Sequence, residues 1–271
     1  MTRLWLNLTL AAALCSFVSA LATDFKWDAD LNCSSGRASS LETSHIDLGD
    51  TEMNSLRVRV LRASIQANVR REFAQYPQFV AGRKLFFGIL TAKQAVNDHG
   101  QTITTVCDSL FGISLLVFGE TSFAVDGDDE GEGEGRYPRT RNCKNGLNTV
   151  LFARIPVVGG VLACKSKGQV HARSNYGERG DERDEGNDLG ELWFQLSHSL
   201  PNASETNEEH INMVRLESRV VDYRPAISGL PPVNALRRAM YLNTQRYAHA
   251  YVMWRFHNHC YRNLLRCSNQ V

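Results

Sequence analysis

The C-terminal part of the chain lacks negative charge: residues 223–271 contain seven arginines but no aspartate, glutamate or lysine. After Pro232 it also lacks proline and glycine, the two residues that break helices most strongly. The spacing of its apolar residues predicts a long helix over residues 232–267, with Pro232 at the first position. At about 1.5 Å per residue this helix would extend for roughly 50 Å, so we expect a break at Asn243 or at residues 257–259.

The sequence also lacks the short motifs of several enzyme classes. It contains no Gly-x-Ser-x-Gly, no phosphate-binding loop, no His-Glu-x-x-His and no dinucleotide-binding fingerprint. No Cys-x-x-Cys pair is present, so the cysteines do not predict a zinc site. Among enzymatic chemistries this leaves general acid–base catalysis by histidines and carboxylates, which has no fixed spacing.

Beyond the N-terminus, no stretch reaches the roughly 18 apolar residues that a membrane-spanning helix needs. The N-terminus itself has Arg3, then an apolar segment over residues 4–18, then the small-x-small sequence Ala20-Leu21-Ala22. This pattern predicts a secretory signal peptide over residues 1–22 and a secreted, extracellular mature protein without a transmembrane segment. An uncleaved anchor is the alternative reading.

Removal of residues 1–22 takes away Cys15 and leaves six cysteines. An even number of cysteines in an oxidising compartment predicts three disulfides. The residues concerned are Cys33, Cys107, Cys143, Cys164, Cys260 and Cys267. On a continuous helix Cys260 and Cys267 would lie about 10 Å apart, too far to pair with each other.

The charge is balanced but unevenly placed. The chain has 30 lysines and arginines and 29 aspartates and glutamates, so loss of Arg3 gives a net charge of 30 − 1 − 29 = 0. This neutral net charge argues against a dedicated nucleic-acid binder, although nucleic acid stays a possible partner. Four arginines fall on the polar side of the predicted helix and are candidate binding residues: Arg237, Arg255, Arg262 and Arg266. The alternative is that they face acidic loops or water.

The order of predicted elements gives an α+β fold. One helix over residues 51–76 is followed by about seven strands and then by the long C-terminal helix. Most links between strands are too short for parallel crossovers, so we expect a mostly antiparallel sheet, linked by disulfides, in one domain over residues 23–271. Residues 23–50 are polar and predict an irregular arm. Residues 91–98 predict a short helical turn, and residues 121–125 a strand that pairs with residues 112–118.

Two low-complexity segments, near residues 126–142 and 174–190, are rich in glycine and charge and predict flexible loops. The first is acidic, but it lacks the spacing of an EF-hand calcium loop, so no metal is assigned to it. No other cofactor is indicated. The sequences Asn32-Cys33-Ser34 and Asn202-Ala203-Ser204 are glycosylation sequons, which makes Asn32 and Asn202 candidate glycan sites.

Two polar residues, Arg246 and His257, fall inside the apolar arc of the C-terminal helix. They can be buried structural residues or, with His249 and a strand glutamate, an acid, a base and a cation for a phosphate. The first reading favours a secreted, effector-like interaction protein with an unknown protein or glycan partner. The second gives the alternative, a secreted hydrolase such as a nuclease, with His249, His257 and Arg246 as its catalytic candidates.

Overall fold

The computed structural model of the chain describes residues 25–47, 55–82, 89–125, 148–163, 189–199, 213–229 and 231–268. The predicted signal peptide, Cys143, Cys164 and Asn202 lie outside these ranges, as do the side chains of Arg266 and Cys267. Almost all of the two charged segments also lies outside them. Only Leu189 and Gly190, which lead into a strand, are described.

Nine strands form one antiparallel sheet in the order β1-β2-β9-β8-β7-β5-β4-β3, with β6 paired to β7. Their bounds are β1 Lys26–Leu31, β2 Ala38–Asp47, β3 Leu90–Val96, β4 Thr102–Asp108, β5 Ser114–Phe118, β6 Ser122–Val125, β7 Asn148–Gly159, β8 Glu191–Ser199 and β9 Met213–Tyr223. The pairing of β2 with β9 joins the two N-terminal strands to the rest of the sheet, with β1 at one edge and β3 at the other. The antiparallel α+β prediction is therefore confirmed.

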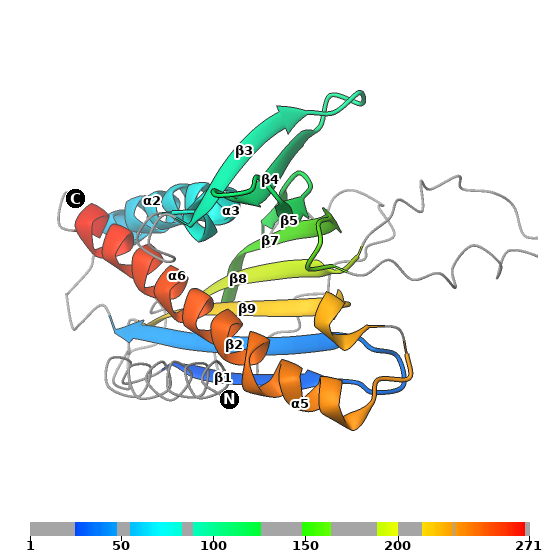
Figure 1. Ribbon diagram of the computed structural model, residues 1–271. Coiled ribbons are helices and arrows are strands. Elements are labelled where there is room, and N and C mark those ends of the chain that lie inside the picture. Colours follow the sequence, from blue (N-terminus) through cyan, green and yellow to red (C-terminus); the bar gives the residue numbers. More distant parts are fainter. Residues whose placement is uncertain are drawn as a thin grey trace, which may run out of the picture.

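The helices lie on one side of this sheet (Figure 1). They are α2 Ser55–Ala74, α3 Tyr76–Val80, the 3₁₀ turn η1 Ala226–Ser228, α5 Ala235–Asn243 and α6 Gln245–Ser268. Helix α6 runs diagonally across the strands, and α2 contacts its C-terminal part. We call the side of the sheet that faces these helices the inner face and the opposite side the outer face.

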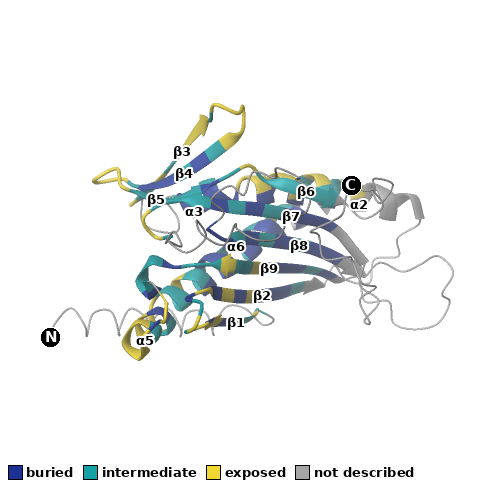
Figure 2. Cartoon of the chain, turned by 90° about the vertical axis from the view of Figure 1, so that its right-hand side faces the viewer, coloured by how far each residue is buried: buried dark blue, intermediate teal, exposed yellow. Residues whose placement is uncertain are grey.

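The main core lies between the inner face and the helices (Figure 2). Aromatic rings from three elements meet there: Phe73 of α2 stacks on Phe194 of β8 at 4.9 Å between centroids, and Phe256 of α6 lies 5.1 Å from Phe194. The Tyr76 ring, at the start of α3, contacts Phe256 at 5.0 Å. Because successive strand residues point to opposite faces, this core takes alternate residues of β7, β8 and β9.

The predicted break in the C-terminal helix is confirmed at Asn243, where α5 ends, and α6 begins two residues later. The His257-Asn258-His259 run is continuous helix. The predicted start at Pro232 is wrong. Asn234 is the N-cap, and its side chain accepts a hydrogen bond from the amide of Arg237.

Residues 23–50, predicted to be an irregular arm, instead contain β1 and β2. The prediction failed because β2 turns Ser40, Glu42 and Ser44 inward and leaves Leu41 38% exposed on the outer face. The usual alternation of apolar and polar residues is thus inverted in this strand.

Three local predictions in the middle of the chain are also wrong. Residues 91–98 are mostly strand β3 rather than a helical turn, because β4 supplies their backbone partners. Strand β6 pairs with β7 instead of β5. The apolar segments over residues 147–155 and 161–167 also predict a hairpin with its turn at residues 156–160, but β7 continues through that turn to Gly159.

No disulfide joins the cysteines whose side chains are described. Cys33, Cys107 and Cys260 are free thiols, and the last two are buried. The predicted disulfide linkage is therefore not seen in this part of the structure. Helix α6 runs through both Cys260 and Cys267, so a bond between these two is excluded by their separation of about 10 Å.

Candidate functional site

One side of α6 carries three polar side chains towards the sheet: His249, His257 and Tyr261. They recur at intervals of eight and four residues, which places them on one side of a helix. Opposite them, β2 contributes Ser40, Glu42 and Ser44, and β9 contributes Ser218. We call these seven residues the inner polar network.

Glu42 is fully buried and fixes the direction of the hydrogen bonds. A carboxylate only accepts, so Ser218 Oγ donates to Glu42 Oε2 at 3.0 Å. With its proton used there, Ser218 must accept from Nε2 of His257, 3.2 Å away. The Nε2–H tautomer of His257 follows from this assignment, and its Nδ1 is left as an acceptor.

The same reasoning extends to Tyr261. Ser44 Oγ lies 2.7 Å from Nδ1 of His257 and donates to it, so it accepts from the hydroxyl of Tyr261 at 2.9 Å. The Tyr261 oxygen in turn accepts the backbone amide of Leu216 at 3.3 Å. Each hydroxyl of this chain therefore donates one hydrogen bond and accepts another, each ring nitrogen of His257 has one role, and the chain ends on Glu42.

Burial keeps the members of this chain in the protonation states that it requires. His257 is 2% exposed, and burial lowers its pKa to about 3, so the ring is neutral at physiological pH. Burial also raises the pKa of the Tyr261 phenol, which stays a donor. A neutral histidine whose two nitrogens are both occupied cannot exchange a proton with a substrate.

His249 is the member of the network closest to solvent, with 24% of its side chain exposed. Its Nε2 lies 3.1 Å from Glu42 Oε1 and 3.1 Å from Ser40 Oγ. In a hydrolytic triad the acid and the nucleophile contact different ring nitrogens of the histidine. Here both contact the same nitrogen, so Ser40, His249 and Glu42 lack the geometry of an activated serine.

Arg246, the third catalytic candidate, is half-buried at the start of α6. Its guanidinium carbon lies 4.7 Å from the centroid of the Trp27 ring, within the range of a cation–π contact. The Tyr247 ring contacts the same indole edge to face at 5.5 Å. The guanidinium is therefore used to hold α6 against β1.

The predicted arginine stripe is divided between two helices. Arg237 belongs to α5, beyond the break, whereas Arg255 and Arg262 belong to α6. Arg237 and Arg262 are exposed and Arg255 is half-buried. The helix break therefore separates Arg237 from the arginines of α6, which a single straight helix would have placed on one stripe.

Asn32 is exposed between β1 and β2, and its side-chain oxygen accepts the amides of Ser34 and Ser35 at 2.9 and 3.1 Å. The cysteine beside it, Cys33, is partly exposed.

Burial raises the pKa of the Cys260 thiol in α6, and the Glu72 carboxylate raises this pKa further by a smaller amount. The Cys260 thiol is therefore protonated.

The outer face carries a different set of charges, which sequence reasoning did not single out. On β9, Arg215, Glu217 and Arg219 project from this face at alternate positions. Glu217, with only 8% of its side chain exposed, lies 2.7 Å from Arg215 Nη2 and 2.6 Å from Arg219 Nη2. Each arginine is paired with this carboxylate through part of its guanidinium, and Arg219 still has half of its side chain exposed.

Trp193 of β8 lies directly across from Arg219. Its indole N–H donates to Glu191 at 2.6 Å, and its ring meets Phe152 edge to face at 5.5 Å. Glu191 also forms an ion pair with Arg154 of β7. The indole is thereby held in one orientation on the outer face.

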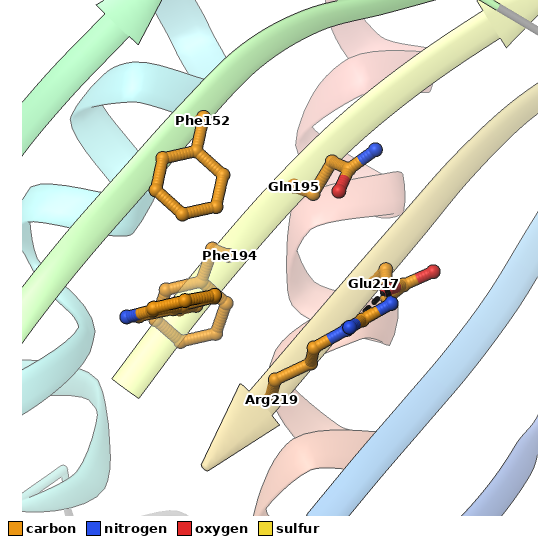
Figure 3. Close-up of a pocket in the computed structure, with 6 residues that line it drawn as sticks. Phe152, Phe194, Gln195, Glu217 and Arg219 are labelled. Carbon is orange, nitrogen blue, oxygen red and sulfur yellow. Dashed lines mark hydrogen bonds and ion pairs between the residues drawn. The ribbon is translucent and has the colours of Figure 1, made fainter. Parts of the chain in front are cut away.

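These residues surround a shallow pocket of about 330 Å³, part of which is open to solvent. It is lined by Phe152, Trp193, Phe194, Gln195, Glu217 and Arg219. In Figure 3 the helices pass behind the strands, while Gln195, Glu217 and Arg219 lie on the near side. The pocket thus combines an aromatic wall with an amide, a carboxylate and a guanidinium, on a face that the described helices leave uncovered.

Among the described residues, no group of three or more histidine, cysteine, aspartate or glutamate side chains could hold a metal ion. No helix in the described ranges is long and apolar enough to cross a membrane. No protein-family model matches the chain, and no curated protein is significantly similar to it. The proposed function therefore rests on the residues of this chain alone.

Proposed function

We propose that this protein is a secreted interaction protein that binds a protein or glycan partner outside the cell through its outer sheet face. The observation that carries the proposal is the pocket beside Trp193, where Gln195 and Arg219 reach solvent next to an oriented indole and the buried carboxylate of Glu217. Tryptophan and arginine are the residues most enriched among those that dominate binding energies. The proposal places partner contact there and not at the arginines of α5 and α6.

A hydrolase is favoured less by the geometry. Its candidates do not converge: His257 is buried, Arg246 stacks on Trp27, and His249 shares one nitrogen between Ser40 and Glu42. A nuclease needs its acid, base and cation within reach of one phosphate.

Secretion, glycosylation at Asn32 and Asn202, and three disulfides are the further parts of this proposal. N-terminal sequencing of exported protein should give a start near residue 21 or 23. The prediction of three disulfides, which the free Cys33, Cys107 and Cys260 of the structure oppose, is tested by thiol titration of the denatured, non-reduced protein. Three disulfides would give a value close to zero. Detection of three thiols would retain Cys33, Cys107 and Cys260 as free.

The binding proposal is tested with labelled mature protein on arrays of extracellular glycans and receptor ectodomains. Trp193→Ala and Arg219→Ala are expected to lose at least tenfold in affinity for the partner found, with little change in melting. Arg262→Ala, an exposed arginine on α6, is the matched control and should bind normally. Equal loss in all three variants would contradict a site on the outer face.

A further inference from the structure

Exposed apolar side chains gather where β4 turns into β5. Leu110 and Phe111 are 76% and 80% exposed, and Ile113, which ends the turn, is 47% exposed. In the described part of the chain, ten large hydrophobic side chains are exposed, and four of them lie elsewhere: Leu41, Val96, Leu236 and Met240. The other six belong to this end of the sheet or to the two segments beside it: Ile89, Leu110, Phe111, Ile113, Val161 and Leu162. We call these six the apolar tip.

Backbone hydrogen bonds hold the three segments of the apolar tip side by side. The amide of Ser109 donates to the carbonyl of Ile89 at 2.7 Å. The amide of Val161 donates to the carbonyl of Ser114 at 2.9 Å, and that of Leu162 to Leu115 at 3.0 Å. Figure 2 shows the exposed β4–β5 turn projecting beyond the strands at one margin of the sheet. The tip is therefore a protruding surface and not a groove.

The turn itself satisfies its backbone donors without water. The Asp108 carboxylate accepts the amides of Leu110 at 3.2 Å and Phe111 at 2.8 Å, and the Asp108 carbonyl accepts that of Gly112 at 2.9 Å. The Asp108 amide donates to the carbonyl of Ile113 at 2.9 Å. Unpaired backbone donors make entry into an apolar phase costly, and here that cost is already removed for every amide from residue 108 to residue 112.

The shape of the tip, more than its size, favours a lipid surface over a protein partner. Six side chains that are 39–80% exposed present on the order of 500 Å² of apolar surface, close to the largest patch of a typical monomer. A stable protein–protein interface takes about 800 Å² from each partner, of which a little over half is apolar, so the area suits either a protein or a lipid surface. The protruding turn with its paired amides suits entry into an apolar phase. Each CH₂ buried there contributes about 0.8 kcal/mol.

The charged residues in the segments of the apolar tip indicate which type of lipid surface it binds. The described segments of the tip, residues 89–91, 108–114 and 160–163, contain no lysine or arginine, and their one charged side chain is Asp108, whereas Arg83, Lys84, Lys165 and Lys167 lie outside the described residues. Anionic headgroups recruit proteins through clusters of basic residues, which these segments lack. We infer that the apolar tip inserts Leu110 and Phe111 into the surface of a zwitterionic bilayer. This inference is independent of the outer-face pocket.

Flotation of the full mature protein with phosphatidylcholine vesicles tests the inference. The wild type should float with the vesicles, and the double variant Leu110→Ser, Phe111→Ser should lose at least tenfold in partitioning. The control is Leu236→Ser, Met240→Ser, which removes two exposed apolar side chains from α5 instead. It should partition within about twofold of the wild type.

The same assay with added phosphatidylserine and with high salt completes the test. Partitioning that is unchanged by both additions supports insertion by apolar side chains. Binding that needs phosphatidylserine and is removed by salt would overturn the inference, as would a wild type that does not float or a tip variant that floats normally. Since both replaced side chains are exposed, melting of the variants should match the wild type, and a variant that melts early is replaced by Phe111→Ser alone.

Discussion

The two faces of the sheet use the same residue types in different ways. On the inner face, Glu42 is fully buried and accepts from Ser218 beside His249. On the outer face, Glu217 is almost as buried, but its partners Arg215 and Arg219 reach solvent. The inner carboxylate ends a buried chain in which every hydrogen bond has a fixed direction. The outer carboxylate is the centre of a cluster that is open to solvent.

This difference determines what each face can do. Loss of one member of the inner chain leaves its neighbours buried without partners, which costs the full desolvation penalty of those groups. Loss of one member of the outer cluster lets its neighbours turn to water, which costs little. The inner polar network is therefore suited to fixing α6 on the sheet, and the outer face to exchanging its contacts with a partner.

The largest expected effect comes from the buried carboxylate. Glu42→Ala should lower the free energy of unfolding by about 3–5 kcal/mol, because it removes the acceptor of Ser218 and the buried carboxylate that lies 3.1 Å from His249 Nε2. Urea denaturation at pH 7 measures this. The matched variant is Glu217→Ala on the outer face, for which we expect about 1 kcal/mol or less. Equal losses would remove the distinction between the two faces.

Ser44 and Ser39, which lie on opposite faces of β2, allow a finer comparison of the two faces. Ser44→Ala should cost about 1–3 kcal/mol, since it leaves Nδ1 of His257 without its donor and the Tyr261 hydroxyl without its acceptor. Ser39→Ala, at an exposed position of β2, should change stability by about 0.5 kcal/mol or less. Denaturant unfolding of both variants supplies the numbers, and a Ser44→Ala protein as stable as Ser39→Ala would argue against a closed inner chain.

A smaller effect on the free energy of unfolding is expected when the pH is lowered. The pKa of His257 is lowered to about 3, so protonation of the unfolded chain below about pH 6.5 favours unfolding. This stabilising contribution is complete above pH 6.5 and is lost as pH falls towards 3. Between pH 8 and pH 5 the wild type should therefore lose about 2 kcal/mol more than His257→Gln, which does not titrate. Parallel pH profiles of the two proteins would show that His257 is not buried as a neutral ring.

The sequence predicted the elements with strong periodicity and missed those with an inverted pattern. The long C-terminal helix and its break at Asn243 follow from apolar spacing and from a weak helix former. Strand β2 was missed because its inward residues are Ser40, Glu42 and Ser44, which read as a loop. Their burial makes sense only beside His257 and Tyr261, more than 200 residues later in the chain.

The candidate site was predicted in part for the same reason. The position of His257 inside an apolar arc correctly indicated burial. Its partners, and the outer cluster around Glu217, depend on which strands are neighbours, and strand order is not encoded in local periodicity. Alternation of charge at Arg215, Glu217 and Arg219 was a visible signal of a solvent-facing strand, but it did not indicate that Trp193 lies opposite.

The most direct test of the contrast between the faces is the protonation state of His257, measured by nitrogen-15 NMR of its ring in the full mature protein. The hydrogen-bond directions predict a proton on Nε2, none on Nδ1, and no change between pH 7 and pH 5. His249, which is partly exposed, provides an internal comparison in the same spectra. A His257 ring that carries its proton on Nδ1, or that becomes doubly protonated above pH 5, would contradict the closed chain that ends on Glu42.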